Sequence, residues 1–282
     1  MTSPALPDWP RLGLGCARVG SFNNPASLGE SIALIRQAAE LGLTLFDTAD
    51  IYGQGDSERA IGTALRNMRD RTFVVTKGGR MFSPKMRALR PLKPLLKPLL
   101  ARTGAGGAVT ARREGNERTD WSRAHLEAAL DASLRRLRMD RVDAFLLHSP
   151  PAELLTQSDL GQTLERIGAS GRAARVGVAC DDIAGLEAAL TLPRLGVLEL
   201  PWDLIATIDG QEPVRTITAR AIPIIARSVI QLQPGTEPIA AIARAVATPV
   251  VTTTLVGSGR IDRIQAIAAR LAASEQSGAE PA

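Results

Sequence analysis

"LTLFDTADIYGQGDSERAIGTALRNMRDRTFVVTK" (residues 43–77) is the stretch on which the fold interpretation depends. Two short apolar runs, 43–49 and 72–77, flank a segment whose pattern at 57–69 predicts a helix with Ser57 as its N-cap. Continuous apolar runs of this length are typical of strands that are buried on both faces of a parallel sheet. The stretch therefore predicts one strand–helix–strand unit of an α/β protein.

The same alternation continues along the whole chain. Strand-like runs lie at 11–17, 43–49, 72–77, 142–148, 173–180, 196–202, 222–228 and 250–257. Helical patterns follow them at 27–42, 57–69, 120–139, 159–169, 182–191, 212–221, 236–247 and 260–274. Eight such units in 282 residues favour a single (β/α)₈ TIM barrel domain over residues 1–282. A doubly wound open sheet is the alternative, but Arg18 stands where the dinucleotide fingerprint needs its third glycine.

One segment, residues 78–119, is longer than the other connections and has a different composition. It contains "PLKPLLKPLL" and "GAGG", and its prolines Pro91, Pro94 and Pro98 prevent a regular helix across that run. The segment follows the third strand, so in a barrel it would lie over the face where active sites form. We expect a long basic loop that acts as a lid, a binding loop or a disordered segment.

The net charge of +5 comes largely from that same loop. Residues 80–118 hold ten Lys or Arg and two Glu, so the rest of the chain is slightly acidic. No aromatic residue lies between Phe82 and Trp121, which argues against a nucleic-acid surface built on stacked bases. Basic charge there could instead steer an anionic substrate toward the site.

Several classes of protein are disfavoured by composition. The first ten residues lack the basic and apolar regions of a signal peptide, and no apolar run is long enough to cross a bilayer. Cys16 and Cys180 are far apart and show no metal-ligand spacing. We predict a cytoplasmic protein that binds no nucleic acid, no membrane and no metal, and the sequence leaves its oligomeric state open.

Polar residues end three neighbouring strands. Asp47 and Tyr52 follow the second strand, Lys77 ends the third and His148 ends the fourth. Each has a structural explanation alone, as a turn residue or a solvated strand end, but carboxyl ends of barrel strands form one active-site face. A nearby ammonium is expected to lower the pKa of the Tyr52 phenol, and a carboxylate fixes that ammonium. The group suits proton transfer to a carbonyl oxygen.

Three stretches, "FDTADIYGQGDSERAIGTAL" (46–65), "VVTKGG" (74–79) and "FLLHSP" (145–150), resemble the signature regions of the aldo-keto reductase superfamily. The spacing is most similar to its bacterial aldose-dehydrogenase and pyridoxal-dehydrogenase-like branch. The resemblance implies an NADP(H)-dependent oxidoreductase, with NAD(H) also possible, that acts on an aldehyde, ketone, aldose or alcohol. It also implies a catalytic tetrad of Asp47, Tyr52, Lys77 and His148, in which Tyr52 is the general acid or base.

The resemblance further implies contacts to the nicotinamide end of the cofactor. Ala179 and Cys180 stand where the family usually has Ser-Asn, and Glu199 stands where glutamine is usual. Trp202 takes the place of an aromatic residue that stacks on the nicotinamide ring, with core packing as its alternative role. Ser228 opens a connection after the seventh strand that is short for the family.

"LVGSGRIDRI" (255–264) is similar to the family's adenosine-phosphate site. A glycine-rich turn that opens a helix offers backbone N–H groups to a phosphate. The implied contacts are Gly257, Ser258, Gly259, Arg260 and Arg263, with Gly257 where lysine is frequent. Solvated arginines on a helix surface are the alternative interpretation of Arg260 and Arg263.

Two functions are compatible with these features. The first is a carbonyl reductase or alcohol dehydrogenase that uses NADP(H). The second is a cofactor-binding regulatory protein on the same fold with little turnover, which is suggested by the departures at Ala179, Cys180 and Glu199. The intact tetrad favours the first.

Overall fold

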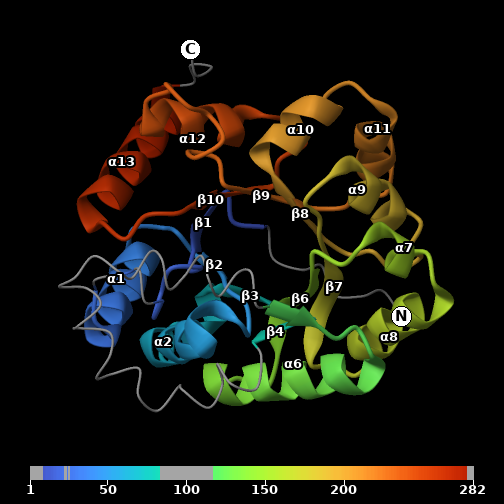
Figure 1. Cartoon of the computed structure of the whole chain (residues 1–282). Helices are drawn as coiled ribbons and strands as arrows, with labels where there is room; N and C mark the ends of the chain where they lie inside the picture. Colours follow the sequence, from blue (N-terminus) through green and yellow to red (C-terminus); the bar gives the residue numbers. More distant parts are fainter. Residues whose placement is uncertain (1–8, 22–23, 25, 83–116, 278–282) are drawn as a thin grey trace.

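Eight parallel strands form a closed barrel in a computed structural model that describes residues 9–21, 24, 26–82 and 117–277. The strands follow one another around the barrel in the order β1-β10-β9-β8-β7-β6-β3-β2 (Figure 1). Their bounds are β1 Leu12–Gly15, β2 Leu45–Asp47, β3 Phe73–Gly78, β6 Val142–His148, β7 Ala173–Ala179, β8 Leu198–Pro201, β9 Ile224–Arg227 and β10 Thr253–Val256. The prediction of a (β/α)₈ TIM barrel is confirmed, and the open sheet is excluded.

Helices surround the barrel (Figure 1). The eight that follow the strands are α1 Leu28–Glu40, α2 Asp56–Ala64, α6 Arg123–Leu137, α8 Ser158–Ala169, α9 Ile183–Leu190, α11 Glu212–Ala219, α12 Pro238–Ala247 and α13 Ile261–Ser277. Two short helices, α7 Ala152–Leu155 and α10 Trp202–Ile208, and two 3₁₀ turns, η1 Tyr52–Gln54 and η2 Arg69–Arg71, were not predicted. Over the described residues, none of the helices has the length and apolar character that crossing a membrane requires.

Helix α2 differs from its prediction at both ends. Its N-cap is Gly55, at φ 82°, whereas Ser57 lies inside the helix. The buried Ser57 hydroxyl donates to the Cys16 carbonyl over 3.0 Å and shares a hydrogen bond with the Thr48 hydroxyl. The prediction of Ser57 as N-cap is therefore wrong, because this side chain joins the helix to the barrel. The helix also ends at Ala64 rather than at residue 69, since η2 turns the chain into β3.

The two ends of the predicted long loop pair with each other. Strand β4 (Arg80–Phe82) runs antiparallel to β5 (Glu117–Thr119), with Phe82 opposite Glu117. This two-stranded ribbon rises from the carboxyl end of β3. Residues 83–116, which include the proline-rich part of the predicted basic loop, lie outside the described residues.

The barrel interior is apolar and ends in a polar layer. Inside lie small and branched side chains that are at most 5% exposed, namely Leu45, Val75, Leu146, Val197, Ile225 and Leu255. Because side chains alternate along a strand, the residue two positions later points inward again. At the carboxyl ends these residues are Asp47, Lys77, His148, Glu199, Arg227 and Gly257. The alternation alone therefore directs five polar side chains toward one mouth of the barrel.

Candidate active site

The four predicted catalytic residues lie together at that mouth. Lys77 forms an ion pair with Asp47 and donates to the Thr48 carbonyl over 3.1 Å. Its Nζ lies 5.4 Å from the centroid of the Tyr52 ring. The rings of Tyr52 and His148 meet edge to face, with centroids 5.6 Å apart. The structure thus gathers an acid, a phenol, an ammonium and an imidazole from four segments of the chain.

Lys77 carries its charge in a fully buried position between two carboxylates. Besides Asp47, Glu199 Oε2 lies 3.0 Å from Lys77 Nζ. Burial disfavours the ammonium, but Asp47 and Glu199 outweigh that effect and raise the pKa of Lys77. Burial, followed by Glu199, raises the pKa of Asp47 against the opposing effect of Lys77. The ammonium is therefore the most firmly held charge in the cluster.

Tyr52 does not behave as expected from the sequence. Desolvation by the surrounding protein raises the pKa of Tyr52 to about 12, although Lys77 lowers it as predicted. The prediction of a net decrease is wrong, because burial and the carboxylates Asp47 and Glu199 together exceed the opposing effects of Lys77 and Arg227. Tyr52 therefore holds its proton at neutral pH.

His148 is a neutral imidazole in this setting. Burial, and then Lys77, Arg80 and Arg227, keep the pKa of His148 well below its usual value. Its Nδ1 is buried and has no hydrogen-bond partner among the described residues. Ser149, the next residue, takes a left-handed backbone conformation at φ 55° that sharply redirects the chain after β6. A neutral ring at this position can hydrogen-bond a substrate oxygen without adding charge.

A cleft of about 670 Å³ extends from the tetrad across the ends of β1, β9 and β10 to the start of α13. Asp47 and Tyr52 line one end of it. Seven of the nine predicted cofactor contacts also line it: Glu199, Ser228, Gly257, Ser258, Gly259, Arg260 and Arg263. An elongated cleft with a proton donor at one end and a glycine-rich helix start at the other fits a dinucleotide.

The distal end of the cleft presents two arginines. Gly257, Ser258 and Gly259 form the turn before α13, and the Ser258 hydroxyl accepts from the Arg260 N–H over 3.1 Å. The Arg260 guanidinium is already paired with the Asp262 carboxylate, with Nε to Oδ1 at 3.1 Å. Arg263 is exposed beside it. Both arginines can reach an anion at this helix start, but Arg260 has to exchange a carboxylate for it.

Two predicted contacts lie outside the lining of the cleft. Cys180 is buried directly after β7, where burial raises the pKa of its thiol. Trp202 begins α10 and is only 8% exposed, packed into the main hydrophobic core. For Trp202 this placement favours the core-packing alternative over stacking on a ring in the cleft.

Two charged residues of the site were missed in the sequence. Arg227 ends β9 and lines the cleft, and it pairs with both Glu199 and Asp181. The signal was present, because Arg227 lies two residues after the inward-facing Ile225, and Asp181 two after Ala179. Applying the strand alternation to every strand end would have found both.

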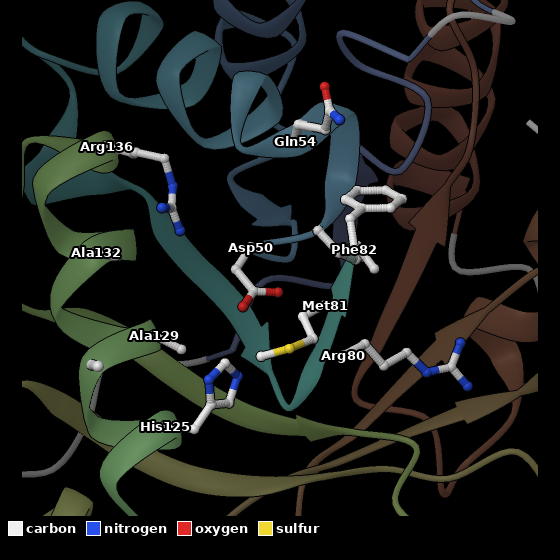
Figure 2. A pocket seen from close by; sticks show the side chains of 11 residues that line it. Asp50, Gln54, Arg80, Met81, Phe82, His125, Ala129, Ala132 and Arg136 are labelled. Atoms are coloured by element: carbon white, nitrogen blue, oxygen red, sulfur yellow. The ribbon is translucent and has the colours of Figure 1, made fainter. Parts of the chain in front are cut away.

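A second cavity of about 550 Å³ lies between the β4–β5 ribbon and α6. Figure 2 shows Asp50, Met81 and His125 directed into it, whereas Arg80 extends to the other side, where it reaches Asp181 at 3.6 Å. Asp50 Oδ1 is buried and finds no hydrogen-bond partner within the part of the chain that the structure describes, and burial holds the pKa of Asp50 well above its usual value. None of the tetrad residues lines this cavity. Across the described ranges, no group of three His, Cys, Asp or Glu is arranged to hold a metal ion.

The chain belongs to the aldo/keto reductase family, whose sequence profile matches residues 11–237. A D-threo-aldose 1-dehydrogenase from a Pseudomonas species is 31% identical over 174 residues, which are 60% of this chain and 49% of that protein. An uncharacterized oxidoreductase, YqkF, from Bacillus subtilis is 27% identical over 160 residues, 56% of this chain and 40% of that one. The matched region therefore spans about half or less of each of these curated relatives.

Solved structures share the fold. The holo form of an aldo-keto reductase from Bacillus halodurans superimposes with a TM-score of 0.71 and 18% identity, covering 93% of this chain and 86% of that one. An aldo-keto reductase from Klebsiella pneumoniae in complex with NADPH gives a TM-score of 0.65 at 21% identity, with 94% and 86% covered. At these identities the similarity establishes the barrel architecture.

Proposed function

We propose that this protein is an NADP(H)-dependent oxidoreductase that interconverts a carbonyl compound and the corresponding alcohol. The observation that carries the proposal is the buried Lys77–Asp47 ion pair beside Tyr52 and His148, at one end of a long cleft. Membership of the aldo/keto reductase family supports it. A cytoplasmic location remains a prediction.

Each residue of the cluster has a distinct role in the proposed reaction. Tyr52 holds a proton at neutral pH and donates it to the substrate carbonyl oxygen during reduction. The Lys77 ammonium stabilises the phenolate that remains, and Asp47 fixes the ammonium in place. Neutral His148 orients the carbonyl oxygen toward the phenol. The nicotinamide cofactor supplies or accepts the hydride.

The cleft supports NADP(H) as the cofactor. The turn before α13 lines its distal end, where a helix start can offer backbone N–H groups, and Arg260 and Arg263 charge, to a ribose 2′-phosphate. At the other end, Glu199 Oε2 pairs with Lys77 at 3.0 Å but accepts no hydrogen bond from the described residues, so it has capacity to accept one from a carboxamide N–H. The NADPH complex of the Klebsiella relative supports the same assignment. NAD(H) is the weaker candidate because it lacks the 2′-phosphate.

Two relatives suggest a substrate class for this proposal. The Pseudomonas relative is an aldose dehydrogenase, and a glycerol dehydrogenase from Gluconobacter oxydans shares the fold with a TM-score of 0.69. We therefore propose small polyhydroxylated aldehydes, aldoses and their alcohols as the first substrates to assay.

The decisive experiment compares the wild type with Tyr52→Phe, which removes only the phenolic hydroxyl. NADPH and NADH binding is measured by calorimetry, and turnover is followed by the absorbance of the reduced cofactor with aldehydes and aldoses. We expect turnover to fall by roughly 100- to 10,000-fold in the variant, with NADPH affinity little changed. Saturable binding without turnover in the wild type would favour the regulatory alternative. Absence of binding to either nucleotide would refute the proposal.

A further inference from the structure

Glu199 places a second carboxylate against the buried ammonium of the site. It comes from β8 and is 2% exposed. One carboxylate oxygen lies 3.0 Å from Lys77 Nζ, and the other lies 3.6 Å from Arg227 Nε. A neutral amide at position 199 would give Lys77 one ionic partner instead of two. The carboxylate is therefore a feature that the proposed reaction does not by itself require.

Arg227 pairs with the other carboxylate oxygen of Glu199, Oε1, rather than with the oxygen that contacts Lys77. Its guanidinium pairs with Asp181 and donates to the Cys180 carbonyl over 3.2 Å. Asp181 also accepts from the Ser149 hydroxyl over 2.9 Å. Negative and positive residues thus alternate in a series of successive ion pairs, in the order Asp47, Lys77, Glu199, Arg227, Asp181. Removal of one member therefore leaves its buried neighbour with less compensation for its charge.

These charges act on Tyr52 in opposite directions. The groups that face it are Asp47 from β2, Lys77 from β3, His148 from β6, Glu199 from β8 and Arg227 from β9. Burial is the largest effect and raises the pKa of Tyr52. Lys77 and Arg227 lower it, whereas Asp47 and Glu199 raise it. Glu199 therefore cancels part of what Lys77 does to the phenol.

We propose that Glu199, held in place by Arg227, is a positioning residue that offsets part of the stabilisation that Lys77 gives to the Tyr52 phenolate. The phenol therefore keeps its proton, and its ability to protonate a carbonyl, far into the alkaline range. The statement about reduction rests on the proposed function, whereas the statement about the phenol does not. In the oxidative direction Glu199 is a disadvantage, because the Tyr52 phenol has to lose its proton before it can act as a base.

The chain offers a direct readout, since Tyr52 is its only tyrosine. Protein labelled with a stable carbon isotope at tyrosine Cζ gives a single resonance whose shift follows ionisation of this phenol. We expect Glu199→Gln to lower the titration midpoint of Tyr52 by about one pH unit, the size expected for the loss of one nearby charge. Glu212→Gln is the matched control, because Glu212 is exposed and pairs with Arg215 on α11. Its midpoint should equal that of the wild type.

The arginine gives a test of opposite sign. We expect Arg227→Gln to move the midpoint up, since Arg227 lowers the pKa of Tyr52, and Arg227→Lys to restore most of the difference. Circular dichroism establishes that each variant is folded at each pH. If folded Glu199→Gln titrates with the wild type, the proposal is overturned. Should Glu199→Gln not fold, equal midpoints for Arg227→Gln and Arg227→Lys would overturn it, and the expected difference would support it.

A second arm uses the enzyme with NADPH and an aldehyde. The alkaline limb of the reductive kcat profile should move to lower pH in Glu199→Gln, and a change confined to KM would contradict the proposal. The isotope titration needs neither cofactor nor turnover. Failure of NADPH to bind would therefore remove the proposed function without deciding the role of Glu199.

Discussion

At the residue scale, the contact between Arg260 and Asp262 bears on the proposed preference for NADPH over NADH. The Arg260 guanidinium is paired with Asp262, two residues later in the first turn of α13. Both side chains are exposed, and Arg260 lines the end of the cleft proposed to hold a 2′-phosphate. The carboxylate competes with the phosphate for Arg260 and also repels it.

We predict that Asp262→Asn tightens NADPH binding by roughly two- to five-fold, the range expected for an exposed ion pair, and leaves NADH binding unchanged. The reason is that only NADPH carries the 2′-phosphate. Calorimetric titration of both nucleotides at low and high salt measures the effect, and the gain should shrink as salt screens the charges. An equal change for NADPH and NADH would show that Asp262 acts through the helix rather than through Arg260.

The clustering of Asp47, Tyr52, Lys77 and His148 could be predicted from the sequence, because each residue ends, or closely follows, a strand that the apolar pattern identifies. The pKa direction of Tyr52 could not, since it depends on burial and on Glu199, which reaches the site from a strand far along the chain. The N-cap prediction for Ser57 failed for a similar reason, because its hydroxyl is used by Cys16 and Thr48. Rules that use only neighbouring residues in the sequence fail where a side chain joins two elements.

At the scale of elements, Gly62 allows α2 to pack closely against α6. A Cβ added at Gly62 would lie 2.2 Å from the carbonyl oxygen of Leu137, the last residue of α6. Glycine is otherwise unfavourable in a helix interior. Its presence in α2 is therefore explained by the close approach of the two helices.

We predict that Gly62→Ala lowers the free energy of unfolding by about 1–3 kcal/mol, because the helices have to separate to admit the methyl group. Gly161→Ala in α8 is the control, since a Cβ there would meet only Leu192 Cδ2 at an ordinary 3.5 Å. That variant should be neutral or more stable by up to about 1 kcal/mol, from helix propensity alone. Chemical denaturation measures both, and equal losses would argue against the packing explanation.

All eight predicted helices are present among the described residues. The sequence did not predict the β4–β5 ribbon, whose strands are only three residues each and stand at the edges of a segment read as one loop. Strands that pair across more than thirty residues leave little local signal.

At the scale of the whole molecule, the buried cluster links stability to alkaline pH. The pKa values of Lys77 and Tyr52 are both raised in the folded protein, Tyr52 to about 12. In the unfolded chain these groups lose their protons near pH 10.4 and about pH 10. Above about pH 10 the folded state thus binds more protons than the unfolded state, and its stability decreases as pH rises.

We predict that the free energy of unfolding declines steadily between about pH 10 and about pH 12, and that the decline is shallower in Tyr52→Phe, where one titrating group is absent. Urea denaturation at a series of pH values provides the measurement. A free energy that stays level across this window in the wild type would contradict the assigned pKa directions.

The β4–β5 ribbon also separates the barrel from the connection between these two strands. Because Phe82 faces Glu117 across β4 and β5, the chain leaves the barrel and returns to it at neighbouring points. The length of the connection between Phe82 and Glu117 therefore does not change the distance between its two ends. We therefore expect the eight strands to keep their register when the length of this connection is changed. The connection and the barrel can thus be altered separately by mutation.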